Sequence, residues 1–270
     1  MIHVDAHHHV WRLDRGDYDW MTPDLPIYRD YGLDDLPPLL GDVTATVLVQ
    51  AAATEAETAF MLEVAAGSGG LVRGVVGWTD FLSADAPAKI GALARSSLIK
   101  GLRPMLQDIA ETGWILREEL RPALAAMASA GLRLDLLVKP RHLPLLPDLA
   151  TRFPELPMVI DHGGKPDIAG GVFQPWADDM ARIAGGTNWC CKLSGLATEA
   201  APGWGVEDLA PYVGHLLACF GPERLMWGSD WPVVNLAGGY ASWRAAAEAL
   251  VPAAARASVF GGTASRFYAI

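Results

Sequence analysis

Two histidines, His7 and His9, stand two residues apart just after a short apolar run near the start of the chain. Side chains alternate between the two faces of a strand, so His7 and His9 can point at one centre while His8 points away. Two imidazoles that converge in this way are a common start of a hydrolytic metal site. The alternative is a tag remnant or a solvated loop, but a tag lies outside the fold among linker residues. Apolar residues flank this run on both sides, which favours a place inside the fold.

The chain alternates short apolar runs, which predict strands, with longer patterns of helical periodicity. Eight strands are predicted, over residues 2–4, 44–50, 72–78, 99–103, 132–138, 157–161, 189–193 and 225–227. Helices are predicted between them, over residues 53–66, 86–95, 118–130, 174–184 and 206–220. Two prolines within residues 141–153 predict a helix that is broken or starts late. An irregular segment, residues 12–40, is predicted to form a flap over the mouth of a pocket.

Eight alternations of strand and helix over 270 residues favour an α/β fold, a single (β/α)8 TIM-barrel domain spanning residues 1–270. A doubly wound open sheet is the alternative. A barrel gathers polar residues at the carboxyl ends of many strands, and no Gly-rich dinucleotide-binding turn follows the first strand here. Seven of the predicted strands end in or precede a candidate site residue: His7 and His9, Trp78, Arg103, Lys139, His162, Ser194 and Asp230.

The sharpest group of candidate residues consists of three histidines and one aspartate: His7, His9, His162 and Asp230. Closure of a barrel makes the first and last strands neighbours, so Asp230 should lie beside His7 and His9. Two imidazoles and a carboxylate can hold a divalent ion and leave a position open for water. His162 comes from the sixth strand and could be a further ligand, or a general acid that polarises a carbonyl.

The composition indicates which kinds of binding partner to expect. The chain carries a net charge of −10, whereas a nucleic-acid partner would require a basic surface. No apolar run reaches the roughly 18 residues of a membrane span, and no signal peptide fits before Asp5, so we expect a cytoplasmic protein. The odd number of cysteines argues against a disulfide framework. We therefore expect a small-molecule substrate and neither a nucleic-acid nor a membrane partner.

Four short motifs occur in order along the chain, at residues 5–11 (DAHHHVW), 161–166 (DHGGKP), 192–195 (KLSG) and 224–232 (RLMWGSDWP). With these motifs at the ends of predicted strands, the chain resembles the amidohydrolase superfamily. More narrowly, it resembles the amidohydrolase-related (amidohydrolase 2) lactonase branch, which includes L-fuconolactonase, L-rhamnonolactonase and 2-pyrone-4,6-dicarboxylate lactonase. The resemblance extends from residue 2 to the closing residues, 260–268.

The resemblance implies a TIM barrel that hydrolyses lactones. It also implies that Asp230 activates the attacking water, and that Arg103 and the histidines bind the carbonyl or carboxylate of the substrate. Ring opening requires a hydroxide equivalent and stabilisation of one oxyanion, which agrees with these roles. His162 would share catalysis with Asp230 by polarising the carbonyl. A structural ion pair is the alternative for Arg103, because arginine is favoured for both tasks.

A divalent metal is an open expectation, with His7, His9 and Asp230 as its ligands if it is present. Metal-dependent relatives in the superfamily usually offer a histidine or a modified lysine from a middle strand. Here Lys139 follows the fifth predicted strand, and no histidine stands at that place. Some lactonases of the branch work without a metal, so the resemblance is compatible with either state. Zinc is favoured among metals because a nitrogen-rich site suits it.

Four more residues are assigned to substrate binding or are weighed against it. Trp11 and Trp78 lie near the carboxyl ends of predicted strands, where a flat ring can stack on the C–H face of a sugar. The alternative is that both fill the core. Lys139 could face solvent instead of substrate, and Ser194 could cap the next segment. A serine nucleophile is not expected, because no G-x-S-x-G turn surrounds Ser194.

The leading hypothesis is a carboxylic-ester hydrolase of carbohydrate metabolism. It would open the lactone of a sugar acid, such as a fucono-, rhamnono- or arabinono-lactone, by attack of water on the ring carbonyl. The alternative keeps the scaffold and changes the reaction to that of a dicarboxylate or muconolactone-type lactonase, a lactone isomerase or a decarboxylase. A barrel that only binds a ligand is disfavoured by the complete set of histidines and aspartate. The sequence determines neither the lactone nor the oligomeric state.

Overall fold

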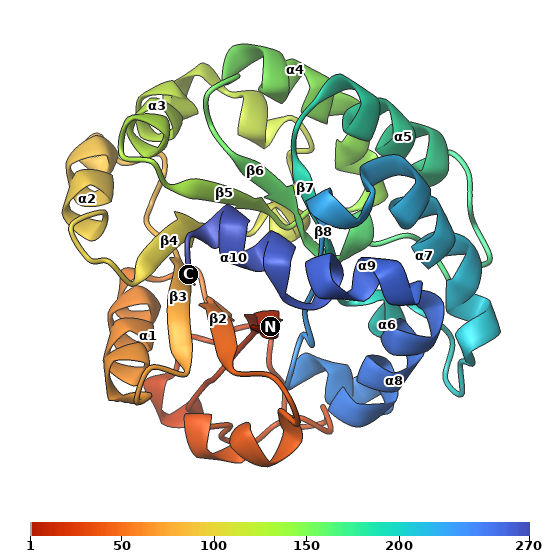
Figure 1. Ribbon diagram of the computed structural model, residues 1–270. Coiled ribbons are helices and arrows are strands. Elements are labelled where there is room, and N and C mark those ends of the chain that lie inside the picture. Colours follow the sequence, from red (N-terminus) through yellow and green to blue (C-terminus); the bar gives the residue numbers. More distant parts are fainter. Residues whose placement is uncertain (1) are drawn as a thin grey trace.

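Eight parallel strands form the sheet of this protein, in the order in which they occur along the chain (Figure 1). The computed structural model describes residues 2–270. Apart from the first, the strands agree with the predicted ones to within a few residues at either end. They are β1 (Val4–His8), β2 (Ala45–Val49), β3 (Val72–Gly77), β4 (Ile99–Leu102), β5 (Arg133–Leu136), β6 (Met158–Ile160), β7 (Cys190–Leu193) and β8 (Leu225–Trp227).

The sheet closes on itself between β1 and β8, which confirms the predicted (β/α)8 barrel and excludes the open doubly wound sheet. His8 and Trp231 form a parallel bridge across this seam. The amide of His9 donates to the carbonyl of Trp231 over 2.7 Å. The amide of Asp230 donates to the carbonyl of His7 over 2.8 Å. The seam therefore joins the beginning of the sequence to its last strand.

The bounds of β1 differ from the prediction. The apolar run predicted a strand over residues 2–4, but the ladder with β2 continues through Asp5 to His8. Polar residues can occupy an interior strand when their buried groups find hydrogen-bond partners. One Asp5 oxygen accepts the amides of His7 at 3.2 Å and of Ser229 at 2.8 Å. His7 is consequently part of β1, and the ladder fixes its position.

Helices surround the strands, and the last one crosses the N-terminal opening of the barrel (Figure 1). The predicted break at residues 141–153 is confirmed, because a 3-10 segment, Pro140–Leu145, precedes the helix that follows it. Tyr268 of the last helix packs with interior strand residues such as Val47. The helices are α1 (Glu55–Gly67), α2 (Ala86–Leu93), α3 (Arg121–Ser129), α4 (Leu146–Arg152), α5 (Trp176–Gly186), α6 (Leu196–Glu199), α7 (Val206–Phe220), α8 (Tyr240–Leu250), α9 (Ala253–Ala257) and α10 (Thr263–Tyr268).

The segment over residues 12–40 is irregular, as predicted. It contains three 3-10 turns, at Leu13–Arg15, Leu33–Asp35 and Pro37–Leu39. Trp11, just before the segment, and Tyr31, within it, pair in an isolated antiparallel bridge. Its function as a flap stays a prediction, as does the extent of the single domain.

The cysteines are free thiols, in agreement with the expected absence of a disulfide framework. Cys190 and Cys191 are buried in β7, and Cys219 is half-buried in α7. In the part of the chain that the structure describes, every helix is too short or too polar to cross a membrane.

Candidate active site

The carboxylate of Asp230 lies among three imidazoles at the carboxyl end of the barrel. Its Oδ1 is 3.2 Å from Nε2 of His9, 3.8 Å from Nε2 of His7 and 3.9 Å from Nε2 of His162. The side chains come from the end of β1, the turn after β6 and the turn after β8, which the closed barrel brings together. The structure thus assembles the predicted group in one place, while the role of each residue stays a prediction.

Two of these residues have a left-handed backbone conformation. The φ angle is +54° at His162 and +59° at Asp230. This conformation is costly for residues other than glycine, and it tends to occur at functional sites where the surrounding fold holds it. At Asp230 the restraint includes the hydrogen bond from its amide to the carbonyl of His7. Both turns aim their side chains into the same space.

Hydrogen bonds on the far side of each ring fix the orientation of the imidazoles. Nδ1 of His9 lies 2.7 Å from the carbonyl oxygen of Val49, so Nδ1 carries a proton and Nε2 faces the site. Nδ1 of His162 lies 2.9 Å from Oγ of Ser194. His8 points the other way, with Nε2 2.9 Å from Oγ1 of Thr46, which confirms the predicted alternation along β1.

A network of buried charges lies beneath the imidazoles, inside the barrel. Lys192 of β7 is 0% exposed, and its Nζ is 2.6 Å from Asp135, 3.0 Å from Asp161 and 3.1 Å from Nδ1 of His7. An ammonium group has three N–H donors, enough for both carboxylates, and the His7 ring lies within hydrogen-bond distance of it. Tyr268 of α10 donates to the same Asp135 oxygen over 2.6 Å. The network therefore links β5, β7 and the last helix to His7.

Arg103, directly after β4, connects this network to the site. Its Nη1 donates to Asp161 over 3.1 Å and lies 3.3 Å from Nε2 of His7. Its Nη2 donates to the carbonyl of Gln50. The ion pair that was the alternative for Arg103 is present, and the same side chain also lines the cavity described below. Both functions are compatible, because the guanidinium has five N–H donors.

Burial and neighbouring charges set the protonation states. Burial lowers the pKa of His162 to about 4, and burial together with Lys192 holds the pKa of His7 well below its usual value. Burial alone would raise the pKa of Asp230, but the imidazole of His162 and the hydrogen bond with His9 outweigh it and lower that pKa. At neutral pH the site thus combines a carboxylate with neutral imidazoles at His7 and His162.

A cavity of about 180 Å³ lies above these groups. His9, Arg103, His162 and Asp230 are part of its wall, whereas His7 is fully buried behind them. Trp20, from the irregular segment after β1, lines the cavity as well. The cavity therefore brings a carboxylate, imidazoles, a guanidinium and an aromatic ring into reach of one small molecule.

Several predicted substrate-binding residues lie elsewhere. Within residues 2–270, the lining of the cavity does not include Trp11, Trp78 or Lys139. Trp11 is fully buried, and its Nε1 donates to the carbonyl of Arg29 over 2.8 Å. Ser194 is also buried and touches His162 instead of the cavity. The assignment of the two tryptophans and of Lys139 to the substrate stays a prediction that the geometry does not support.

Other residues of the site were not assigned a function from the sequence. Asp135 and Lys192 were missed, although a charged residue within an apolar strand is a detectable signal of a buried pair. Asp161 and Lys192 are each the first residue of one of the four motifs, but their types and spacing alone indicate no function. Trp20 had no signal, because an aromatic residue in an irregular segment has no predictable orientation.

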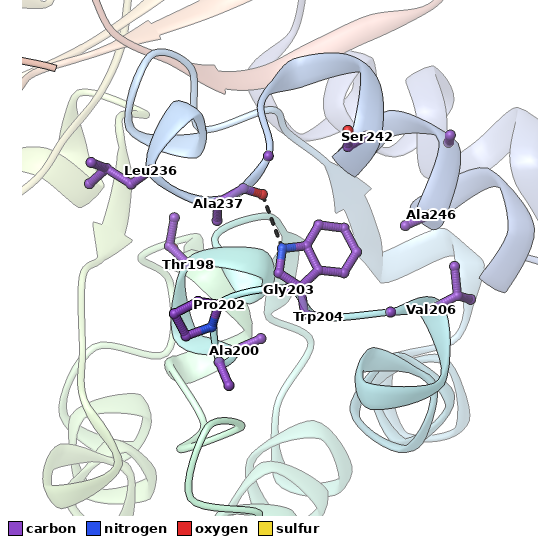
Figure 2. A pocket seen from close by; sticks show the side chains of 14 residues that line it. Thr198, Ala200, Pro202, Gly203, Trp204, Val206, Leu236, Ala237, Ser242 and Ala246 are labelled. Carbon is purple, nitrogen blue, oxygen red and sulfur yellow. Dashed lines mark hydrogen bonds between the residues drawn. The ribbon is translucent and has the colours of Figure 1, made fainter. Parts of the chain in front are cut away.

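A larger hollow, of about 690 Å³, lies between the residues that follow β7 and those that follow β8 (Figure 2). Figure 2 shows the indole of Trp204 within it, with Nε1 donating to the carbonyl of Ala237 over 3.0 Å. None of the described residues that line it has an ionisable side chain. Hydrolysis requires an acid or a base. The smaller cavity, which Asp230 lines, is therefore the better candidate for the active site.

The donor atoms around Asp230 fit a metal ion. His7, His9 and Asp230 offer ligand atoms that lie within 4.8 Å of one another, and His7, Asp161 and His162 form a second such group. Nδ1 of His9 donates to Val49, so Nε2 is the ring nitrogen that faces the Asp230 carboxylate, at 3.2 Å. Imidazole nitrogens and a carboxylate oxygen are ligands that zinc accepts in proteins. The residues present therefore suit a divalent ion.

The sequence of this chain is similar to the sequences of known hydrolases. The family model described as Amidohydrolase matches residues 4–270. The L-fucono-1,5-lactonase of Burkholderia ambifaria is 46% identical over 99% of this chain and 95% of its own. The enzyme of the same name from Burkholderia multivorans is 35% identical over 100% and 96%.

Two solved structures are similar over their full length. An amidohydrolase from Burkholderia multivorans with bound zinc has a TM-score of 0.93 at 33% identity, with 100% of both chains covered. A probable 2-pyrone-4,6-dicarboxylic acid hydrolase from Acinetobacter baumannii has a TM-score of 0.85 at 18% identity, also with 100% of both chains covered. At that identity the second likeness concerns the fold alone.

Proposed function

The chain belongs to the amidohydrolase family, and from that premise we propose that it is a carboxylic-ester hydrolase that opens the lactone of a sugar acid. The observation that carries the proposal is the Asp230 carboxylate in its group of imidazoles, 3.2 Å from His9, in the cavity wall. A carboxylate beside imidazoles and the guanidinium of Arg103 supplies a base and donors for an oxyanion. Relatives named L-fucono-1,5-lactonase support an aldonolactone as substrate.

In the proposed reaction, Asp230 accepts a proton from water while the water oxygen attacks the ring carbonyl carbon. The carbonyl oxygen becomes an oxyanion, to which Arg103 and His162 donate hydrogen bonds. When the ring C–O bond breaks, the ring oxygen takes the proton from Asp230, and the product is an open-chain hydroxy acid. The lowered pKa makes Asp230 a weaker base than an ordinary aspartate, so its position must contribute more to the rate than its basicity.

Ser194 determines which nitrogen of His162 carries the proton in this proposal. If the serine hydroxyl donates to Nδ1 over the observed 2.9 Å, a neutral ring keeps its proton on Nε2, which faces Asp230 and the cavity. We expect Ser194→Ala to lower kcat roughly 10-fold to 100-fold, with a smaller change in KM. Initial rates measure this, and Ser194→Thr, which keeps a hydroxyl, is the matched control. Full activity in Ser194→Ala would contradict the assignment.

We further propose that one divalent ion, zinc before others, can be held by His7, His9 and Asp230. When bound, such an ion polarises a carbonyl and lowers the pKa of a water molecule. Two observations support it: Nε2 of His9 faces the carboxylate at 3.2 Å, and a solved structure at 33% identity holds zinc. Asp230, Arg103 and His162 keep the tasks described above in the presence or absence of the ion.

Metal binding can be tested without an activity measurement. We expect the purified protein, incubated with zinc and then desalted, to retain about one ion per chain, as a site with three protein ligands would. His9→Asn should retain much less, because it removes one imidazole donor. Elemental analysis measures both, and zinc retained equally by the two proteins would contradict this site. Rates before and after chelation then show whether hydrolysis depends on the ion.

A screen of lactones with a pH indicator tests the proposed function. Sugar-acid lactones such as L-fucono-1,5-lactone should release acid at rates above the spontaneous reaction, and dicarboxylate lactones should react slowly or not at all. If the protein opened dicarboxylate or muconolactone-type lactones faster than sugar-acid lactones, the result would favour the alternative, a dicarboxylate or muconolactone-type lactonase. Failure to open any lactone, together with carbon dioxide release from a carboxylated substrate, would favour a decarboxylase and overturn the proposal.

The proposed partner is therefore a small lactone. The net charge of −10 supports the absence of a nucleic-acid partner, because a phosphate backbone would be repelled. Location in the cytoplasm is likewise part of the proposal, since the substrates of such an enzyme are intermediates of carbohydrate metabolism.

A further inference from the structure

The lining of the cavity contains side chains of two kinds. Seven are polar or charged: His9, Arg103, Gln107, Asp108, His162, Lys165 and Asp230. The other five offer apolar surface: Trp20, Ala51, Met105, Leu137 and Val233. A sugar ring has the same division, because its hydroxyls and carbonyl are polar while its C–H groups form apolar faces. The cavity is therefore suited to a ring that turns its reactive carbonyl toward Asp230 and the imidazoles and a C–H face toward the apolar side chains.

Trp20 is the tryptophan among the apolar lining residues, and it is held in a defined position. Its Nε1 donates to the carbonyl of Ala51 over 2.8 Å. Its ring meets the buried ring of Trp11 edge to face, with centroids 5.5 Å apart and planes at 88°. Even so, Trp20 is 38% exposed, whereas Trp11 is 0% exposed. A large aromatic side chain that is anchored and still exposed at a cavity has surface available for a ligand.

The anchor of Trp20 depends on one buried carboxylate, that of Glu57 in α1. Glu57 is 0% exposed and accepts the hydroxyl of Tyr18 over 2.7 Å. Its other oxygen accepts the amide of Ala51 over 3.2 Å. Tyr18 stands two residues before Trp20, and Ala51 is the residue whose carbonyl accepts the indole N–H. The carboxylate of Glu57 thus holds both Ala51, which bonds the indole, and Tyr18, which is close to Trp20 in the chain.

Further contacts hold the same part of the segment. Arg15 donates to Asp17 over 2.6 Å and lies 3.4 Å from Glu57. Thr54, which caps α1, donates to Asp17 over 2.8 Å. These side chains join the irregular segment after β1 to the start of α1. The cluster does not touch Asp230 or the imidazoles, so no catalytic group explains why it is there.

We propose that Trp20 forms a subsite for the apolar C–H face of the lactone ring, and that Glu57 is the positioning residue that holds this subsite in place. The inference rests on the proposed function and adds the contact that selects a ring with an uninterrupted C–H face. Trp20 touches the substrate, while Glu57 acts only through Tyr18 and Ala51. Loss of the ring should weaken binding more than it slows the chemical step, because stacking on a C–H face stabilises the ground state and the transition state alike.

The first test replaces the ring. We expect Trp20→Ala to raise KM for L-fucono-1,5-lactone about tenfold or more, with kcat within about threefold of the wild type. Trp20→Phe should recover most of the affinity, since it keeps an aromatic face. Trp204→Ala is the matched control, because Trp204 is also an indole bonded to a backbone carbonyl, but it lines the hollow without ionisable groups. It should leave KM unchanged.

The second test separates positioning from general stability by a double-mutant cycle. Glu57→Ala should raise KM by an amount similar to Trp20→Ala, and Glu57→Gln, which can still bond Tyr18 and Ala51, should recover it. In a Trp20→Ala background, Glu57→Ala should add little, because the ring that it positions is gone. Additive effects of the two changes would overturn the role of Glu57.

The outcomes distinguish this inference from the function on which it rests. A wild-type protein that opens L-fucono-1,5-lactone, together with a Trp20→Ala variant of unchanged KM, would overturn the subsite alone. A wild-type protein that opens no lactone would overturn both. A large fall in kcat with unchanged KM in Trp20→Ala would also overturn the subsite, because it would place the ring at the chemical step.

Discussion

Asp230→Asn should lower kcat for lactone hydrolysis by about 10²-fold to 10⁴-fold, the range expected when a general base is removed. Asparagine keeps the size of the side chain, and its amide can still meet His9, but it cannot accept the proton of the attacking water. Initial rates on L-fucono-1,5-lactone measure the effect, and thermal unfolding should show that the fold is kept. Asp80→Asn, an exposed change in the turn after β3, is the control and should react like the wild type.

The pH dependence of kcat adds a second check on the same site. The pKa of His162 is lowered to about 4, and that of Asp230 is held below its usual range. Both groups therefore keep their neutral-pH states well into the acid range, so the rate should stay level from pH 7 to about pH 5. It should fall as the pH drops through about 4, because the protonated His162 then attracts the Asp230 carboxylate and makes it a weaker base. A wild-type rate that falls between pH 7 and pH 6 would contradict these protonation states.

The fold and the central group of residues could be predicted because both follow from local patterns. Short apolar runs predict the strands, and the segments of helical periodicity between them predict the helices. Eight such alternations of strand and helix favour a barrel. Barrel closure then places Asp230 beside His7 and His9 without any knowledge of loops. The alternation along β1 separated His8 from its neighbours for the same reason.

The remaining parts of the site depend on contacts between distant segments. Trp11 and Trp20 both belong to the region after β1, and nothing in their sequence context shows which ring reaches the cavity. Their positions follow from the bridge between Trp11 and Tyr31 and from the bond between Trp20 and Ala51. The end of β1 was misplaced because Asp5 continues the strand through hydrogen bonds that only the closed barrel provides.

Lys192→Met should lower the free energy of unfolding by about 3–5 kcal/mol, the cost of breaking a buried ion pair by removing one partner. Lys192 is fully buried and is the ammonium that lies between Asp135 and Asp161. Methionine has a similar length but donates no hydrogen bond, so it leaves two buried carboxylates without their shared cation. Urea unfolding followed by circular dichroism measures the change. Lys89→Met is the control, since the exposed pair of Lys89 with Glu55 should contribute little.

The pH dependence of that loss identifies its cause. Burial already raises the pKa of Asp135 to about 6, although Lys192 opposes the shift. Without Lys192 that pKa should rise further, and a carboxyl group whose pKa is raised by folding loses stability as the pH increases. The deficit of Lys192→Met should therefore be larger at pH 8 than at pH 5, where Asp135 can bind a proton. Asp135→Asn added to Lys192→Met should restore part of the stability at pH 8, because Asp161 still pairs with Arg103 whereas Asp135 has lost its cation. A deficit equal at both pH values would instead indicate a packing defect, and the charge network would then contribute nothing specific to the barrel interior.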